Sequence, residues 1–429
     1  MIKRFLPVVR NESVRMVIAL SASRNLLIHQ MDVSTAFLNG NLKEEVYMNQ
    51  PEGFKEGNMV CKLKKSLYGL KQAPRCWNIT LDQHLKEMGL IQSKADPCIY
   101  TSKEGELTIL AVYVDDIIIA TETTERLNFL KTCLADKFGV KDLGEIHSFL
   151  GIQIKQDSKA IWIGQPGYLA RVLETFGMTN AKPVSTPIDA GMKLQTESPV
   201  SNRPVDTLLY QSAVGSLQYL SNWTRPDITY AVNKAAQYSA NPQKEHWIAI
   251  KRIMRYLIGT KDHGMSYRKG SEEGLSGYCD ADWAGDTSDR KSTSGYVFNL
   301  AGSPISWRSQ KQSCIALSTA EAEYVALSLA AQETVWLRRL MEELNQDVTN
   351  PTIIFDDSQS ATALAKNPQF HRKTKHIDIR YHFIRDQVEK GFVTIKYCAS
   401  ADMLADILTK GLQRLTHDKL SEKLNTTMS

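Results

Sequence analysis

The sequence has few cysteines and no long hydrophobic run, and both shortages exclude classes of protein. Its seven cysteines are scattered, odd in number and contain no C-x-x-C pair, which argues against a zinc ribbon and a disulfide framework. No apolar run approaches the roughly 20 residues of a membrane helix, and the N-terminal residues lack the hydrophobic region of a signal peptide. We therefore expect an intracellular protein with no membrane partner.

Charge and composition exclude few further classes of protein. The 52 basic and 47 acidic residues leave a net charge of +5, which would tolerate a polyanionic partner without establishing one. With 42% hydrophobic and 23% charged residues the chain is typical of folded globular proteins. Its 429 residues predict two or three domains, and no repeat or low-complexity tract is present.

Residues 1–160 alternate short β-rich runs with helical patterns, as in an α/β or α+β domain. The patterns predict a strand at 26–33, two β-branched hairpin arms at 108–114 and 117–121, and amphipathic helices at 14–25 and 77–88. The pair Asp115-Asp116 falls at the tip of the predicted hairpin.

Residues 161–267 are predicted to be mainly helical, with helices at 167–176, 207–223, 226–239 and 242–259. A stretch rich in proline, serine and threonine at 182–200 is typical of a connector. The last helix carries Lys251, Arg252 and Arg255 opposite its apolar face. Two interpretations stay open: a solvated basic face, or a surface that follows nucleic-acid phosphates.

Residues 268–429 predict a third domain with a mixed α/β sheet of ordinary size. The expected order is three strands at 275–280, 295–300 and 305–308, a long helix at 319–344, a strand at 352–355, helices at 358–366 and 376–390, a strand at 393–397 and a short helix at 403–410.

An aspartate pair inside an apolar strand pattern needs a physical reason. Adjacent carboxylates repel, and their desolvation costs several kcal/mol unless a cation or a proton compensates. A plain hairpin turn would also favour aspartate. Asp32 ends another apolar strand, and three carboxylates at strand ends are a natural cage for two Mg²⁺ ions in phosphoryl transfer.

Longer strings give the pair a family context. Tyr113-Val-Asp-Asp116 resembles the polymerase signature of reverse transcriptases. The chain as a whole resembles the Pol polyprotein of copia-type LTR retrotransposons, on strings that include Asp32-Val-Ser-Thr-Ala-Phe-Leu-Asn-Gly40, Ser66-Leu-Tyr-Gly-Leu-Lys-Gln-Ala-Pro-Arg75, Phe149-Leu-Gly-Ile-Gln-Ile154, Lys291-Ser-Thr-Ser-Gly-Tyr296, Ser318-Thr-Ala-Glu-Ala-Glu-Tyr324 and Lys375-His-Ile-Asp378. The resemblance implies a reverse-transcriptase palm at 1–160, a helical thumb and connection at 161–267, and a ribonuclease H-like domain at 268–429.

The resemblance also assigns roles in polymerisation. Asp32, Asp115 and Asp116 would be the metal site, and Phe37 would be the aromatic gate that excludes a ribose 2′-OH. The nucleotide and template would lie against a second group, made of Tyr68, Gly69, Lys71 and Gln72. Gly151 would belong to the primer grip at 149–154. Without the resemblance, Phe37 is better explained as a core aromatic at a strand end, and the two segments are a turn before a helix and a short buried strand.

A second acid set in the last domain follows the order of a ribonuclease H fold, namely Asp280, Glu323, Asp357 and Asp406. Nearby acids are rivals: Glu321 fits a capping box with Ser318, and Asp282, Asp356 and Asp402 are second choices, with Asp402 a candidate helix cap. A basic group could hold phosphate or release the cut strand, although a wet helix face is the simpler interpretation: Lys373, Lys375, His376, Arg380 and His382.

These features predict an RNA-directed DNA polymerase and ribonuclease H with two Mg²⁺ or Mn²⁺ ions in each site. The implied partners are an RNA template, a DNA primer, the RNA–DNA hybrid, dNTPs, and the integrase and capsid of the same element, in a cytoplasmic virus-like particle or the nucleus. The chain enters just before the first catalytic strand, which predicts a 5′-truncated fragment without the fingers residues that grip the triphosphate, and hence poor primer extension.

Two other functions remain as alternatives. A catalytically silent nucleic-acid-binding relic would share these motifs. A cellular ribonuclease H with an accessory binding domain would have no use for the palm motifs.

Overall fold

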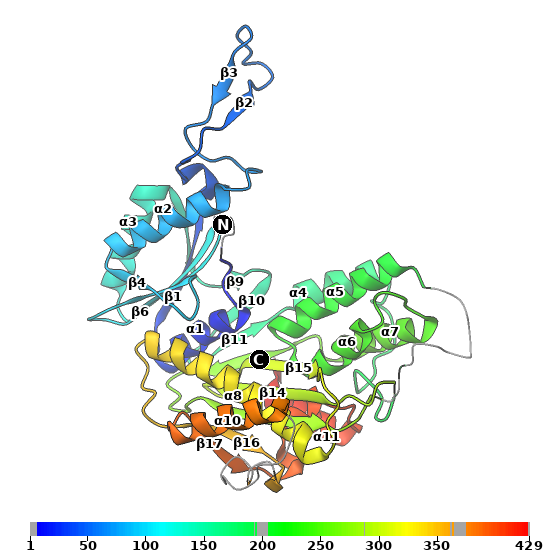
Figure 1. Cartoon of the computed structure of the whole chain (residues 1–429). Coiled ribbons are helices and arrows are strands. Elements are labelled where there is room, and N and C mark those ends of the chain that lie inside the picture. The colour runs from blue at the N-terminus through cyan, green and yellow to red at the C-terminus, as the bar shows by residue number, and fades with distance from the viewer. Residues whose placement is uncertain are drawn as a thin grey trace. The chain divides into compact units, whose positions relative to one another are not determined.

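The computed structural model describes residues 7–192, 194, 205–286, 288–360, 363 and 375–427 (Figure 1). The chain divides into two compact units, described separately below. The first comprises Met1–Val17, Arg24–Ile146 and Leu340–Gln346, and the second comprises Ile18–Ser23, His147–Arg339 and Asp347–Ser429.

The first unit is built on a six-stranded antiparallel sheet in the order β4-β5-β6-β7-β1-β8. Its strands are β1 (Leu27–Val33), β4 (Leu90–Gln92), β5 (Ile99–Ser102), β6 (Thr108–Tyr113), β7 (Asp116–Thr121) and β8 (Val140–Glu145). The predicted strand at 26–33 and the predicted hairpin are therefore confirmed, while β4, β5 and β8 were not predicted.

Two helices, α2 (Ala73–Glu87) and α3 (Thr124–Phe138), cover one face of this sheet. Trp77, Leu81 and Leu85 recur at helical spacing on α2 and are buried against strand residues such as Leu110. Burial of each such side chain stabilises the fold by about 1.5–3 kcal/mol. The helix pair therefore packs on the sheet whose adjacent strands β1 and β7 carry Asp32 and Asp116.

The remaining elements of the first unit are short or shared. They are α1 (Asn11–Ser23), which is divided between the two units, the 3-10 helix η1 (Ala36–Asn39), and a hairpin of β2 (Tyr47–Asn49) and β3 (Val60–Lys62). The hairpin was not predicted, because its strand residues are exposed or half-buried and give no alternating apolar pattern.

The second unit contains two sheets. One is antiparallel, in the order β18-β12-β11-β10-β9, and joins segments that the sequence analysis placed in three domains. Its strands are β9 (Ser148–Phe149), β10 (Ile152–Gln156), β11 (Ala160–Gly164), β12 (His263–Arg268) and β18 (Thr426–Thr427).

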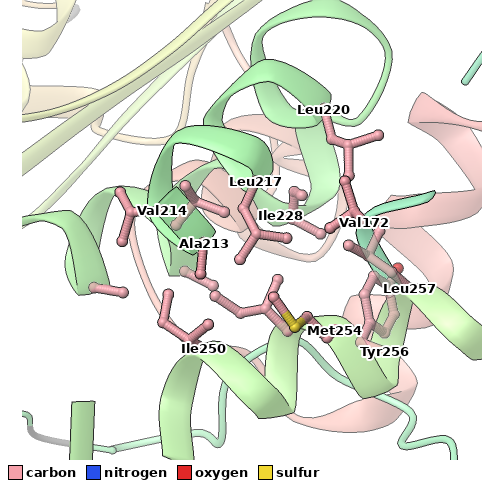
Figure 2. Packing of buried hydrophobic residues seen from close by; sticks show 14 of the residues in the cluster. Val172, Ala213, Val214, Leu217, Leu220, Ile228, Ile250, Met254, Tyr256 and Leu257 are labelled. Carbon is pink, nitrogen blue, oxygen red and sulfur yellow. The ribbon is translucent and has the colours of Figure 1, made fainter. Parts of the chain in front are cut away.

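A helical bundle follows β11 in the chain. It consists of α4 (Pro166–Thr175), α5 (Thr207–Trp223), η2 (Pro226–Ile228), α6 (Thr229–Ala236) and α7 (Lys244–Gly259). Figure 2 shows its core, where Leu217 of α5 and Met254 of α7 are fully buried. The predicted helices are confirmed, except that 226–239 is a 3-10 turn followed by a shorter α-helix.

The second sheet is mixed and runs in the order β15-β14-β13-β16-β17, with parallel pairs only at β13–β16 and β16–β17. Its strands are β13 (Ser276–Asp282), β14 (Thr293–Leu300), β15 (Ser303–Lys311), β16 (Thr352–Asp356) and β17 (Val393–Tyr397). This order confirms the predicted mixed sheet. Asp280 was predicted to end its strand, but it lies two residues before the end of β13.

The helices of this part are α8 (Thr319–Glu343), α10 (Lys375–Glu389) and α11 (Arg414–Leu424), with the 3-10 helices η3 (Ser400–Asp402) and η4 (Leu404–Leu408). The predicted short helix at 403–410 is confirmed as the shorter 3-10 helix η4, whereas α11 was not predicted. The predicted helix at 358–366 and the connector at 182–200 lie partly outside the described residues.

Candidate active sites

The first candidate site lies at the turn between β6 and β7. Asp116 opens β7 opposite Asp32 of β1, so two carboxylates meet on adjacent strands, with Asp115 beside them in the turn. Val114 has a φ of +55°, an unfavourable conformation for a β-branched residue. The turn is held by Trp77 Nε1, which donates to the Val114 carbonyl at 2.8 Å, and by the Val33 amide, which donates to the Asp115 carbonyl at 2.8 Å.

The surroundings of Asp115 and Asp116 oppose the ionisation of these two carboxyl groups. Burial raises the pKa of Asp115 and of Asp116, and the negative charge of Asp32 raises both further. Gln30 Nε2 donates to Asp116 Oδ1 at 3.0 Å, and the Tyr68 hydroxyl lies 3.5 Å from Asp115 Oδ2. Asp115 Oδ1 is buried and has no hydrogen-bond partner among the described residues. Such a site gains from a bound cation.

Some of the predicted nucleotide-binding residues lie near this turn, namely Phe37 and Tyr68. The rings of Phe37 and Tyr68 pack with centroids 4.7 Å apart, and Tyr68 is 54% exposed. Gly69 has a φ of +92°, a left-handed conformation that favours glycine, and Gln72 is the residue before α2. Lys71 is exposed. The structure thus joins Phe37 to the Tyr68 segment and, through Tyr68, to Asp115.

Gly151 belongs to the second unit, in the turn between β9 and β10. Its φ is +78°, and an added Cβ would lie 3.0 Å from the Tyr219 hydroxyl. That hydroxyl donates to the Leu150 carbonyl. Glycine is therefore required here by the backbone, whether or not the turn holds a primer.

The second candidate site lies on the mixed sheet. Among the described residues, Asp280, Glu323 and Asp357 are the one group of three acidic, histidine or cysteine side chains whose ligand atoms all lie within 4.8 Å of one another. The aspartates of the first site do not meet this distance. Asp280 comes from β13, Glu323 from the first turns of α8, and Asp357 directly follows β16.

The fourth predicted acid, Asp406, joins this cluster through a lysine. Lys410 Nζ lies 2.9 Å from Asp406 Oδ1 and 3.7 Å from Asp280 Oδ2. The Thr409 hydroxyl donates to Asp280 Oδ2, and the Ser400 hydroxyl donates to Asp357 Oδ2 at 2.7 Å. Sequence reasoning missed these three side chains, although Thr409 and Lys410 follow Asp406 by three and four residues.

Burial dominates the electrostatics of the second site. It raises the pKa of Glu323 to about 10, with further contributions from Asp280, Asp356 and Asp357. Burial and the charge of Asp280 raise the pKa of Asp406 to about 7. For Lys410 burial acts in the opposite direction, but Asp280 and Asp406 raise its pKa overall. Without a cation, Glu323 therefore retains its proton at neutral pH.

The structure separates the rival acids from the predicted ligands. Glu321 Oε2 accepts from the Leu317 amide at 3.0 Å, and the Glu321 amide donates to Ser318 Oγ at 3.2 Å, so Glu321 caps α8. Asp356 is fully buried and accepts from the Ser358 amide at 2.6 Å. Asp402 is no helix cap, since it accepts from Lys419 and Lys423.

Asp282 is the third rival. It is half-buried, and its carboxylate packs so closely on Gly285 that a Cβ there would clash with Asp282 Oδ2. Of the basic group predicted to handle phosphate, His382 is exposed on α10, Arg380 is half-buried, and the side chains of Lys373, Lys375 and His376 lie outside the described residues.

Two of the three residues on the basic face of α7 have partners within the protein. Arg252 pairs with Asp189 at 2.6 Å and donates to Thr186 Oγ1 at 2.9 Å, while Arg255 Nε donates to the Lys182 carbonyl at 2.6 Å. Lys251 is half-buried. Arg252 and Arg255 therefore bind the connector, and no local sequence pattern predicts this contact.

This contact predicts a weak role for Arg252 in nucleic-acid binding. The loss of one phosphate contact changes the slope of log binding constant against log salt concentration by about 0.9. Because Asp189 already neutralises the charge of Arg252, we expect Arg252→Gln to change this slope for hybrid binding by much less. Asp189→Asn, which breaks the same pair but keeps the arginine, is the matched control. Fluorescence anisotropy at several salt concentrations measures both. A full unit of slope lost in Arg252→Gln alone would restore the phosphate-tracking interpretation.

Both acid sites fit divalent cations. Carboxylate oxygens are the ligands that Mg²⁺ and Mn²⁺ prefer, and each site holds a buried oxygen without a hydrogen-bond partner among the described residues, Asp115 Oδ1 and Glu323 Oε2. Buried like charges are costly until a cation joins them.

Over the described ranges, no helix is both apolar enough and long enough to span a membrane.

Comparisons with known proteins agree with this geometry. A family model of reverse transcriptases (RNA-dependent DNA polymerases) matches residues 1–190. The chain is 44% identical over 421 residues to the retrovirus-related Pol polyprotein from transposon TNT 1-94 of Nicotiana tabacum, covering 96% of this chain and 32% of that protein. It is 35% identical over 311 residues to a transposon Ty5-1 protein of Saccharomyces cerevisiae, covering 71% of this chain and 100% of that protein.

A solved structure shares the fold. The foamy viral protease-reverse transcriptase dRH in complex with double-stranded DNA aligns with a TM-score of 0.51 at 15% identity, over 89% of this chain and 59% of that chain. The fold is thus that of a reverse transcriptase followed by a ribonuclease H-like domain. The chain belongs to the copia-type Pol polyproteins of LTR retrotransposons. It spans about a third of the length of the tobacco relative.

Proposed function

We propose that this chain is the RNA-directed DNA polymerase and ribonuclease H region of a copia-type Pol polyprotein. The observation that carries the proposal is the convergence of Asp280, Glu323 and Asp357 from three separate elements within 4.8 Å. Asp280 and Glu323 are buried, where neighbouring like charges are costly without a cation, and metal-assisted phosphoryl transfer uses such a cluster. The pairing of Asp32 with Asp116 at the adjacent ends of β1 and β7 supports the polymerase part.

In this proposal the substrates are an RNA template, a DNA primer, dNTPs and the RNA–DNA hybrid. The integrase and capsid of the same element would be partners, in a virus-like particle. The cofactor is Mg²⁺, with Mn²⁺ as a substitute, two ions to each site. When bound, these ions would neutralise the carboxylates and stabilise charge on the attacking and leaving oxygens.

The residues of this chain supply position. Hydroxyl donors orient Asp280 and Asp357, from Thr409 and Ser400 respectively, and each aspartate keeps one ligand oxygen within 4.8 Å of those of its partners in the cluster. In the palm, Asp115 follows the left-handed Val114 in the turn, and the Tyr68 hydroxyl beside it belongs to a ring that packs on Phe37. We propose that this aromatic pair contacts the incoming nucleotide, with Phe37 excluding a 2′-OH.

Activity of the 429-residue chain tests the proposal directly. We expect Mg²⁺-dependent cleavage of the RNA in an RNA–DNA hybrid and no cutting of double-stranded DNA, since a 2′-OH is what such a site reads. We also expect extension of oligo(dT) on poly(rA) to fall at least about 100-fold in Asp115→Asn, the size of effect when a preorganised charge is removed. Asp142→Asn, on the exposed strand β8, is the matched control.

The outcomes separate the two halves of the proposal. Cleavage together with extension that is equally fast in the unchanged chain and in Asp115→Asn would leave only the ribonuclease H part. Binding of the hybrid with neither reaction would favour the alternative, a catalytically silent nucleic-acid-binding relic.

A further inference from the structure

A lysine ammonium lies between two carboxylates of the second site. Lys410 Nζ is 2.9 Å from Asp406 Oδ1 and 3.7 Å from Asp280 Oδ2. The Thr409 hydroxyl donates to the same oxygen of Asp280. Asp280 thus divides its oxygens: Oδ2 faces Thr409 and Lys410, and Oδ1 is not engaged by either.

The partners differ in burial. The side chains of Asp280 and Asp406 are 3% and 9% exposed, whereas that of Lys410 is 38% exposed. The fold therefore holds the two carboxylates in place, while the lysine reaches them from the surface on a flexible four-carbon stem. The ammonium can leave toward water without any movement of the backbone.

Position in the chain makes this arrangement simple to build. η4 carries Asp406 and ends at Leu408, so Thr409 and Lys410 emerge beside Asp406 and both turn toward β13. Gly295 of β14 permits the close packing, because a Cβ there would lie 2.8 Å from atoms of Leu408 and Thr409.

We propose that Lys410 is a positioning residue that takes the place of a divalent cation between Asp280 and Asp406 in the metal-free protein, and that metal binding there must displace it. The inference rests on the proposed function, because it needs the acid cluster to be a metal site. It implies an order: the first ion enters among Asp280, Glu323 and Asp357, and the second competes with the ammonium.

Mn²⁺ binding to the full chain without nucleic acid tests this order. Isothermal titration of the unchanged protein with Mn²⁺ alone is expected to show one tighter and one weaker site. In Lys410→Met the affinity of the weaker site is expected to rise at least about fivefold, the size typical of two coupled ligands. Thermal unfolding in EDTA is expected at a lower temperature in Lys410→Met, which leaves the carboxylates uncompensated. Lys410→Arg should stay close to the unchanged protein in both measurements.

Controls separate the possible failures. Lys419→Met removes a lysine that pairs with Asp402 at 3.0 Å outside the cluster, and is expected to leave Mn²⁺ binding unchanged. Lys410→Gln is measured beside Lys410→Met so that a packing defect in one does not decide the result. Unchanged or weaker Mn²⁺ binding in both would overturn the role of Lys410. If Glu323→Gln also bound Mn²⁺ normally, the metal site itself, and with it the proposed function, would be wrong.

Discussion

We expect Glu323→Gln to lower hybrid cleavage by at least about 100-fold and Glu321→Gln to retain it. Glu323 is 4% exposed and contributes a ligand atom to the acid cluster, while Glu321, two residues earlier, caps α8. Loss of a preorganised charged group at a reacting centre costs this much or more. The two variants make the same chemical change on the same helix, so each is the control for the other.

The measurement is the rate of RNA cleavage in a labelled hybrid by the full chain with Mg²⁺. The reverse result, with cleavage lost in Glu321→Gln and kept in Glu323→Gln, would exchange the cap and the ligand. If neither variant mattered, the assignment of the whole site would fall.

Glu323→Gln also has an expected effect on stability without metal. The folded protein raises the pKa of Glu323 from 4.5 to about 10, chiefly by burial, so it retains a proton that the unfolded chain releases above about pH 4.5. The free energy of unfolding therefore falls as pH rises from there toward 10. Glutamine has no proton to lose, so in EDTA at pH 8 the variant is expected to unfold at a higher temperature.

The second large effect is on folding. We expect Asp227→Ala to lower the free energy of unfolding by about 3–5 kcal/mol, the cost of leaving a buried charge unpaired. Asp227 and Arg225 are buried and paired at 2.7 Å, the Tyr256 hydroxyl donates to Asp227 at 2.6 Å, and Arg225 Nη1 donates to the Thr260 carbonyl at 2.9 Å. The network ties η2 to α7.

Urea unfolding by circular dichroism measures the loss. Glu273→Ala is the matched control, because it breaks an exposed pair with Arg268 in the same unit, where both side chains are more than half exposed, and costs about 1 kcal/mol or less. Burial opposes the charged form of Asp227, but Arg225 holds its pKa at about 2, so this stabilisation is lost only as pH falls below 3.8 toward 2. Equal costs for the two variants would contradict the prediction.

The sequence predicted the elements whose signals are local. Helix α5 and strand β17 match their predicted limits, whereas the acids were selected by the family resemblance and by their places at or near the ends of predicted elements. Glu323 was chosen over Glu321 by capping chemistry alone, and the structure agrees with the cap.

What was missed depends on contacts between distant residues. β12 pairs with β11 across the whole bundle, and Arg252 finds its partner in the connector. Helix α11 has a polar sequence in which only His417, Leu420, Ser421 and Leu424 are buried, too few for a clear apolar stripe. Lys410 and Thr409 carry no signal until Asp280 is brought beside them.

The pairing of β11 with β12 makes the helical bundle an insertion into a hairpin. Gly164 lies opposite Gly264, so the ends of residues 165–262 meet on adjacent strands. Closing so long an excursion costs chain entropy that grows only slowly with length, and helices that fold within the excursion bring its ends together. Changes in length inside the bundle, at the connector above all, therefore leave the register of the surrounding strands intact, and this part of the chain can diverge in size while the strands that frame it stay fixed.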